Sequence, residues 1–443
     1  YLLEVNGRYD GSSKFAKDHR YAFFPSVSAA WRISEENFWQ PLKGWWNDMK
    51  IRGSYGSLGN QVMDDLGNFP YLATYGTNSS YNYLINGSKP VIVKAPGLVA
   101  PDFTWETVTQ MDFGFDASFL NNRLTGTFDW YRRNTKDMLV AGATLPATLG
   151  ASVPKSNSAD MKTIGWELSL GWNDRLENGF SYWVKGVLSD YQATITKYAG
   201  NDAGFYSQSD GDGKYYVGQK IGEIWGYHSN GLFQSDDEAA TIDQSELYAG
   251  KWGAGDVKYE DLDGDGKITK GEETIYNPGD KSIIGNKTPR YQFGITVGFD
   301  YKNFDFEMFW QGTGKRDYML SGAQFWGFTS QWDVPYTPAL DYWTETNTDA
   351  YFPRPGWQNG GNRVTSDRYL QSAAYGRLKN LTVGYTIPKN LTTKWGISRL
   401  RLYVTGENLL TITPLNDAFD PETLGGLTYP INRKVAIGLN LTL

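Results

Sequence analysis

Along most of the chain, apolar and polar residues alternate one by one instead of recurring at the helical spacing of three or four. Met111, Phe113 and Phe115 alternate with polar or small residues, and the segment from Val435 to Leu443 follows the same pattern. A period of two places successive side chains on opposite faces of a β-strand. The pattern therefore predicts an all-β protein in which each strand has one apolar face.

Twelve segments show this alternation, and most run to about ten residues or more, longer than the usual five or six of a soluble sheet. The predicted strands cover residues 1–10, 26–33, 49–59, 107–119, 123–133, 162–172, 180–197, 290–301, 304–311, 373–385, 399–409 and 434–443. Their apolar rows begin and end in Tyr, Trp or Phe, which is typical of strands that cross both interfaces of a membrane.

The connections between these strands alternate in length. Short or moderate connections cover 34–48, 121–122, 174–179, 302–303 and 388–398, and long ones cover 60–106, 134–161, 198–289, 312–372 and 411–433. Outer-membrane barrels have short periplasmic turns and long external loops, because antiparallel strands place every second connection on the same side. The sequence thus predicts a transmembrane antiparallel β-barrel with long extracellular loops and its carboxyl terminus on the short-turn side.

Composition excludes several other classes of protein. The 443 residues include no Cys, so the chain has no disulfide framework, thiolate metal site or cysteine nucleophile. A formal charge of −7 offers no electrostatic footprint for nucleic acid. The low mean hydropathy suits a soluble protein, but two-faced barrel strands produce the same average.

The chain also resembles a known family through blocks of residues spread over its length. These blocks are YDGSSKF at 9–15, FPSVSAAWRI at 24–33, KIRGSYG at 50–56, GYHSNGLF at 226–233, GDVKYED at 255–261, GNKTPRY at 285–291, YGRLKNL at 375–381 and GENLL at 406–410. In this order they are similar to the carboxyl-terminal part of SusC/RagA-type TonB-dependent outer-membrane transporters. The resemblance implies that residues 1–443 form about twelve strands of a barrel of roughly 22, without the plug domain and the first strands.

The resemblance further implies a function in the outer membrane of a Gram-negative bacterium. Members of this family import oligosaccharides or peptides, work with a SusD-like surface lipoprotein and draw energy through TonB. The alternative is a secreted, calcium-braced all-β carbohydrate-binding protein or adhesin. An enzyme is not expected, because the spacing ties neither His19 nor His228 to a Ser or Asp that would complete a hydrolytic triad.

One motif has specific metal chemistry. Residues 261–272 (DLDGDGKITKGE), within the 198–289 connection, have the spacing of a twelve-residue calcium loop, and Gly266 stands where the sharp turn is needed. The predicted ligands are Asp261, Asp263, Asp265, Glu272 and the backbone carbonyl of Lys267. These hard oxygen ligands predict a structural Ca²⁺ that braces an external loop, and the alternative is an acidic, Gly-rich turn that binds nothing.

Aromatic side chains are concentrated in the 312–372 connection. The candidates for substrate binding are Trp326, Trp332, Tyr336, Trp343 and Trp357. Flat aromatic faces suit sugar rings, and they suit equally a peptide, the partner lipoprotein, or packing of the loop against itself.

Overall fold

The computed structural model describes residues 1–61, 67–78, 84–85, 87–89, 91–100, 103–141, 146–151, 153–206, 215–424 and 428–443. Twelve strands form one antiparallel sheet, in which sheet order follows chain order. These strands are β1 (Leu2–Gly11), β2 (Tyr21–Arg32), β3 (Trp46–Asn60), β6 (Glu106–Phe119), β7 (Leu124–Ala141), β8 (Lys155–Arg175), β9 (Ser181–Tyr198), β14 (Arg290–Tyr301), β15 (Phe304–Lys315), β18 (Tyr375–Thr386), β19 (Arg399–Ile412) and β20 (Lys434–Thr442). The predicted all-β fold is confirmed.

The two faces of this sheet differ in chemistry. On β6, Phe113 and Phe115 are 53% and 39% exposed, although both are large and apolar. Asp112 and Asp116 alternate with them and lie near Arg52 of β3, at 3.8 and 3.3 Å. Exposed apolar side chains suit lipid, whereas paired charges suit the polar interior of a barrel. The alternation in sequence therefore separates a lipid face from a lumen face.

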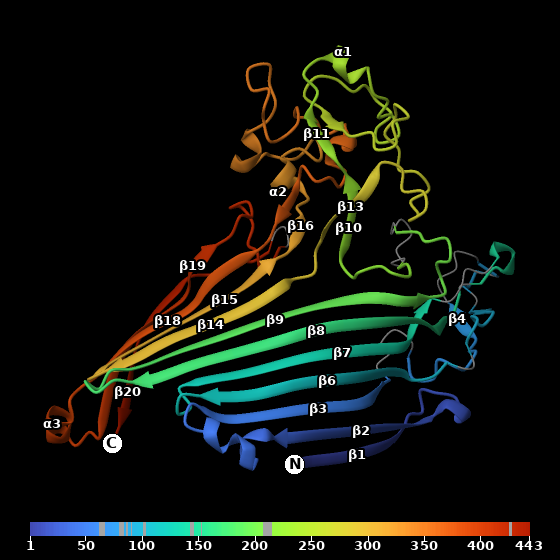
Figure 1. Cartoon of the computed structure of the whole chain (residues 1–443). Coiled ribbons are helices and arrows are strands. Elements are labelled where there is room, and N and C mark those ends of the chain that lie inside the picture. The colour runs from blue at the N-terminus through green and yellow to red at the C-terminus, as the bar shows by residue number, and fades with distance from the viewer. Residues whose placement is uncertain are drawn as a thin grey trace.

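The connections are sorted by length to opposite ends of the sheet (Figure 1). The short helix α3 (Lys389–Thr392) lies at one end, and the helices α1 (Asp236–Ala239) and α2 (Ala323–Trp326) lie at the other. The end with α1 and α2 collects the long connections, which correspond to the external loops. Across the described ranges, no helix has the length and apolar character required to cross a membrane.

The connections also contain small elements. Two-stranded sheets are formed by β4 (Gly76–Asn78) with β5 (Ile92–Lys94), β10 (Glu223–Tyr227) with β13 (Lys281–Asn286), β11 (Ser229–Leu232) with β12 (Val257–Tyr259), and β16 (Asp317–Met319) with β17 (Leu370–Ser372). The 3₁₀-helices are η1 (Lys17–His19), η2 (Ile33–Glu35), η3 (Asn37–Leu42), η4 (Ala147–Leu149), η5 (Thr337–Leu340), η6 (Gly360–Arg363) and η7 (Thr393–Trp395).

The strands β7 and β8 are longer than the sequence predicts. Their ladder continues to the pair Ala141 and Lys155, beyond the predicted bounds at 133 and 162. The register shifts between Thr135 and Met138, where Asp137 has a φ of 57°. An irregularity of this kind changes which face successive side chains occupy, so the simple alternation stops before the strand does.

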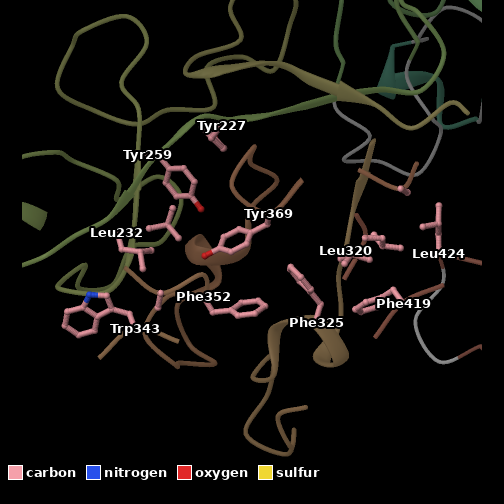
Figure 2. Close-up of a cluster of buried hydrophobic side chains, with 14 of the residues drawn as sticks. Tyr227, Leu232, Tyr259, Leu320, Phe325, Trp343, Phe352, Tyr369, Phe419 and Leu424 are labelled. Atoms are coloured by element: carbon pink, nitrogen blue, oxygen red, sulfur yellow. The ribbon is translucent and has the colours of Figure 1, made fainter. Parts of the chain in front are cut away.

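The largest buried core lies among the external loops (Figure 2). It joins the connections 199–289, 316–374 and 413–433, which we together call the loop cap. Tyr259 and Tyr369, from two of these connections, are both fully buried, and Phe419 of the third is 8% exposed. The Tyr259 hydroxyl donates a hydrogen bond of 2.7 Å to the carbonyl of Gly361. The long loops thus share one hydrophobic core instead of extending separately into water.

Candidate functional site

The acidic motif folds into a turn that brings three carboxylates together. Asp261, Asp263 and Asp265 each place a carboxylate oxygen so that the three atoms lie within 4.8 Å of one another. Asp261 accepts backbone hydrogen bonds from Gly264 at 2.7 Å and Gly266 at 2.8 Å. Both glycines have positive φ, 77° and 83°, which the tight turn requires and which other residues rarely adopt. The sequence therefore predicted this convergence correctly.

The electrostatics of the turn reflect the crowding of negative charge. The backbone N–H of Gly266 holds the pKa of Asp261 below its usual value. For Asp263, the N–H of Asp265 acts to lower the pKa, but desolvation and the charges of Asp265, Asp280 and Asp261 outweigh it, and the pKa is raised. Repulsion between like charges that raises a carboxyl pKa is relieved when a cation binds.

The remaining predicted ligands lie around this turn. Lys267 is exposed, and its backbone N–H donates a hydrogen bond of 2.8 Å to Asp265. Glu272 is also exposed, and among the described residues it does not belong to the group of converging carboxylates. The structure therefore brings Asp261, Asp263 and Asp265 together and leaves Glu272 outside.

A fourth acidic residue, Asp280, closes the loop from beyond the twelve-residue motif. It is fully buried, and its two carboxylate oxygens accept the backbone N–H groups of Leu262 and Thr269, each at 2.7 Å. Asp280 thus ties the beginning of the turn to its end. Sequence reasoning missed this residue because it lies outside the calcium-loop spacing, and its only local signal is its place directly before β13.

The five candidate aromatic residues divide into two environments. Trp343 is 9% exposed, and the ring of Trp326 lies 4.6 Å from that of Tyr369, so both belong to the core of the loop cap. The exposed candidates are Trp332, Tyr336 and Trp357, with 83%, 49% and 46% of their surface accessible. Only the exposed rings present free faces to a ligand.

The loop cap also contains a cavity of about 760 Å³, which we call the interloop cavity. It is lined by residues of β10, β13 and β16 and by the segment 363–365. In its lining, the rings of Tyr206 and Trp225 stack at 4.1 Å, and the ammonium group of Lys281 lies 5.5 Å from the ring centroid of Tyr227. A concave site of this volume with aromatic and charged groups is a typical ligand pocket.

Near this cavity, His228 links two loops that are far apart in sequence. Its Nδ1 lies 2.7 Å from Asp367 Oδ2, and its Nε2 lies 2.7 Å from Ser282 Oγ. Spacing in the sequence did not reveal these partners. The order Ser, His, Asp is also that of hydrolytic triads. Ser282, however, pairs with Gly226 inside the β10–β13 ladder and is not at an exposed strand-to-helix turn, so we interpret the contacts as a clamp between the loops.

The lipid face, the polar lumen face, the short turns at one end and the packed loops at the other define part of the wall of an outer-membrane β-barrel. Residues 1–409 match the family model described as TonB dependent receptor-like, beta-barrel. The chain belongs to this family, and the resemblance to SusC/RagA-type transporters of the Gram-negative outer membrane is confirmed.

Individual relatives support the assignment over the whole chain. Over 462 residues the chain is 30% identical to the TonB-dependent receptor P26 of Formosa agariphila, and over 452 residues it is 27% identical to the TonB-dependent receptor SusC of Bacteroides thetaiotaomicron. Both comparisons cover 100% of the chain but 44% and 42% of the relatives. The chain therefore spans less than half the length of these proteins.

The same architecture is found in a solved structure of the RagAB peptide transporter. The two folds superpose with a TM-score of 0.77 at 22% sequence identity, over 99% of this chain and 45% of the other. This likeness concerns the fold.

Proposed function

We propose that this chain is the barrel wall and external loop cap of an active importer that carries oligosaccharides or peptides across the outer membrane. It performs no chemical step of its own. The observation that carries the proposal is the packed loop cap above a wall with a polar lumen face, because an importer needs a rigid external binding surface over a polar passage.

The proposal includes two partners. A SusD-like surface lipoprotein binds on the external side, and TonB supplies energy from the periplasmic side. The support is the similarity to SusC and to RagAB. Exposed aromatic side chains of the loop cap, such as Trp332 and Tyr336, provide contact surface for the lipoprotein or for substrate.

We also propose that the turn formed by Asp261, Asp263 and Asp265 holds a structural Ca²⁺. Three converging carboxylates offer the hard oxygen ligands that this ion prefers. A bound cation would fix the turn beside Asp280 and so stabilise the 199–289 part of the loop cap. Its role is that of a brace, since the turn is one element of a larger packed loop.

The test is a deletion of the gene in its native host, followed by growth on a panel of defined oligosaccharides and peptides as sole nutrient. We expect loss of growth on one class, with growth on the corresponding monomers retained. Uptake should also stop when the proton-motive force is dissipated. Growth of the deletion strain on every oligomer at the parental rate would contradict import.

A fractionation experiment separates the proposal from the alternative of a secreted binding protein. The full-length protein should sediment with outer membranes and require detergent for release. Affinity purification from these membranes should recover a lipoprotein of comparable amount. A protein that stays in the soluble fraction without detergent would support the secreted alternative.

A further inference from the structure

The interloop cavity has an unusual balance of charge for a chain with a formal charge of −7. Its lining contains the cations Lys270, Lys281, Lys287 and Arg363 and the carboxylates Glu223 and Glu246. Lys281 forms a 2.8 Å ion pair with Glu273, which lies outside the lining. Even with Lys281 neutralised in this way, the described part of the lining holds three cations and two carboxylates.

The cations and carboxylates of the lining also differ in whether they already have hydrogen-bond or ion-pair partners within the protein. Glu223 accepts hydrogen bonds from the Tyr216 hydroxyl and from the backbone of Lys220, the latter at 3.1 Å. Lys270, Lys287 and Arg363 have no carboxylate within 4.0 Å in the described part of the chain. Bound carboxylates and unpaired cations leave a cavity that attracts anions, because concave walls of low dielectric focus the field of unbalanced charge.

Arg363 is held in place without losing its charge. Its guanidinium donates to the backbone carbonyls of Phe328, Gly356 and Trp357, at 3.0, 3.3 and 3.1 Å. Carbonyl oxygens fix the orientation of the group but do not neutralise it. Asp333 acts on Arg363 only from a longer range, and its own carboxylate accepts hydrogen bonds from Thr329 and Ser330. Arg363 thus keeps its positive charge, which adds to the potential at the edge of the cavity.

Aromatic rings lie around one of these cations, Lys281. Lys281 lies 5.8 Å from the centroid of Tyr206 and 5.5 Å from that of Tyr227, and Tyr206 stacks on Trp225. The Nε1 atom of Trp225 is buried without a hydrogen-bond partner. A ligand whose rings present apolar faces and carry anionic groups matches this lining better than a flexible chain does.

We propose that the interloop cavity binds an anionic oligosaccharide, one that bears carboxylate or sulfate groups on its sugar rings. This inference deepens the proposed function and rests on it, since it names the class of substrate. The anionic groups bind Lys270 and Lys287, Arg363 adds to the positive potential, and the rings lie against the aromatic lining. The aromatic surface of the loop cap outside the cavity contributes no charge selectivity.

The test measures binding by calorimetry, with the full-length protein and its co-purifying partner in detergent. The probes are oligogalacturonate, the same oligomer with its carboxylates methyl-esterified, a sulfated galactan oligomer and an oligoglutamate peptide. Esterification removes the charge and keeps the rings. We expect at least one of the two anionic oligosaccharides to bind at least about tenfold more tightly than the esterified oligomer. Its affinity should fall when the salt concentration is raised from about 0.1 M to about 1 M, because the Debye length shortens from about 10 Å to about 3 Å over this range.

Charge-removing variants locate the site. Lys270 and Lys287 are exposed, so Lys270→Gln and Lys287→Gln should retain the fold. Each substitution should weaken binding by about two- to fivefold, which is the effect of losing one exposed charge contact. Lys17→Gln removes the same charge from another external loop, outside the cavity, and should leave affinity unchanged. Folding of each variant is checked by heat-modifiable mobility on gels.

Three results would overturn the inference: equal affinity for the esterified oligomer, equal effects of Lys17→Gln and the cavity variants, or cavity-dependent binding of oligoglutamate alone. Each leaves import itself intact. Conversely, if charge-selective binding is found but the gene deletion leaves growth on all oligomers unchanged, the proposed import function fails and the binding site stands.

Discussion

Arg401 on β19 forms an ion pair with Asp305 on β15, although β18 runs between these two strands. The Arg401 Nε donates to Asp305 Oδ1 at 2.9 Å, directly over Gly384 of β18. A Cβ at Gly384 would lie 2.6 Å from Arg401 Nε. The pair therefore depends on the absence of a side chain in the middle strand.

The same arrangement occurs nearer the other edge of the sheet, on the strands β3, β6 and β7. Arg52 of β3 pairs with Asp129 of β7 across β6, and a Cβ at Gly114 would lie 2.9 Å from Arg52 Cζ. Arg52, Gly114 and Asp129 occupy one cross-strand row of the ladder. Glycine on the lumen face thus allows charges to pair over two strand spacings, which links three strands through one interaction.

The first prediction concerns this ion pair. Gly384→Ala should separate Arg401 from Asp305 and cost about 1 kcal/mol, because the colliding atoms are ends of flexible side chains that can move apart. The urea midpoint of the folded barrel, measured by heat-modifiable mobility, should fall. In an Asp305→Ala background the same change should cost less, and Gly186→Ala on β9, where the added atom meets open space, should cost least. If Gly384→Ala cost the same in the wild-type and the Asp305→Ala backgrounds, the ion pair between Arg401 and Asp305 would not depend on the glycine.

Sequence reasoning recovered the sheet because a barrel strand is defined locally. Each strand must alternate, since one face meets lipid and the other the lumen, so the period of two is visible without knowledge of any partner. The exceptions are local as well. The register of β7 shifts around Asp137. The alternation of side chains from Met138 to Ala141 is therefore out of phase with the alternation earlier in the strand.

The loop cap could not be predicted in this way. Tyr259 and Tyr369 lie in different connections and meet only in the folded core, and neither belongs to a periodic pattern. His228 forms its hydrogen bond with Asp367, which lies 139 residues further along the chain. Spacing revealed Asp261, Asp263 and Asp265 because their ligand atoms converge within one turn. Asp280 binds the same turn through tertiary structure, which spacing does not encode.

The second prediction concerns the acidic turn. Chelation of calcium should make the 199–289 connection more sensitive to protease, and Asp263→Asn should reproduce this sensitivity in the presence of calcium. Asp237→Asn, an exposed change elsewhere in the same connection, is the matched control. Cleavage is followed by limited proteolysis of intact outer membranes. Identical cleavage with and without chelator would show that the turn binds no structural calcium.

The third prediction separates Asp280 from the metal. Asp280→Ala removes the acceptors for Leu262 and Thr269, and hydrogen bonds to a charged group are worth about 1.5–3 kcal/mol each. The connection should therefore become protease-sensitive whether or not calcium is present. If added calcium fully restored resistance in this variant, Asp280 would not be the independent anchor that the structure indicates.

The fourth prediction concerns Arg377, whose side chain is 3% exposed. It binds Asp420 at 2.5 Å and Glu422 at 3.2 Å, and so attaches the 413–433 connection to β18. Arg377→Ala leaves Asp420 without this partner, while Glu422 keeps its 3.1 Å ion pair with Lys379. Because Asp420 is partly exposed, we expect a cost of about 2–4 kcal/mol. Hydrogen exchange of residues 413–424 should accelerate.

Two comparisons test this assignment. Arg377→Lys keeps the charge and should retain part of the protection, whereas Arg8→Ala, which breaks the exposed pair with Asp10, should cost less than about 1 kcal/mol. Unchanged exchange of residues 413–424 in Arg377→Ala would mean that the hydrophobic contacts of Phe419 alone hold this loop.

The last prediction distinguishes the two groups of aromatic residues in the loop cap. Trp343→Ala removes a buried ring and should destabilise the cap by about 3–5 kcal/mol, with faster proteolysis of the 316–374 connection. Trp332→Ala and Trp357→Ala remove exposed rings, so they should leave proteolysis unchanged and weaken binding of substrate or of the partner lipoprotein. Affinity for each is measured separately with the purified full-length protein. If neither affinity changes in a Trp332→Ala, Trp357→Ala double variant, these two exposed rings are not part of the binding surface.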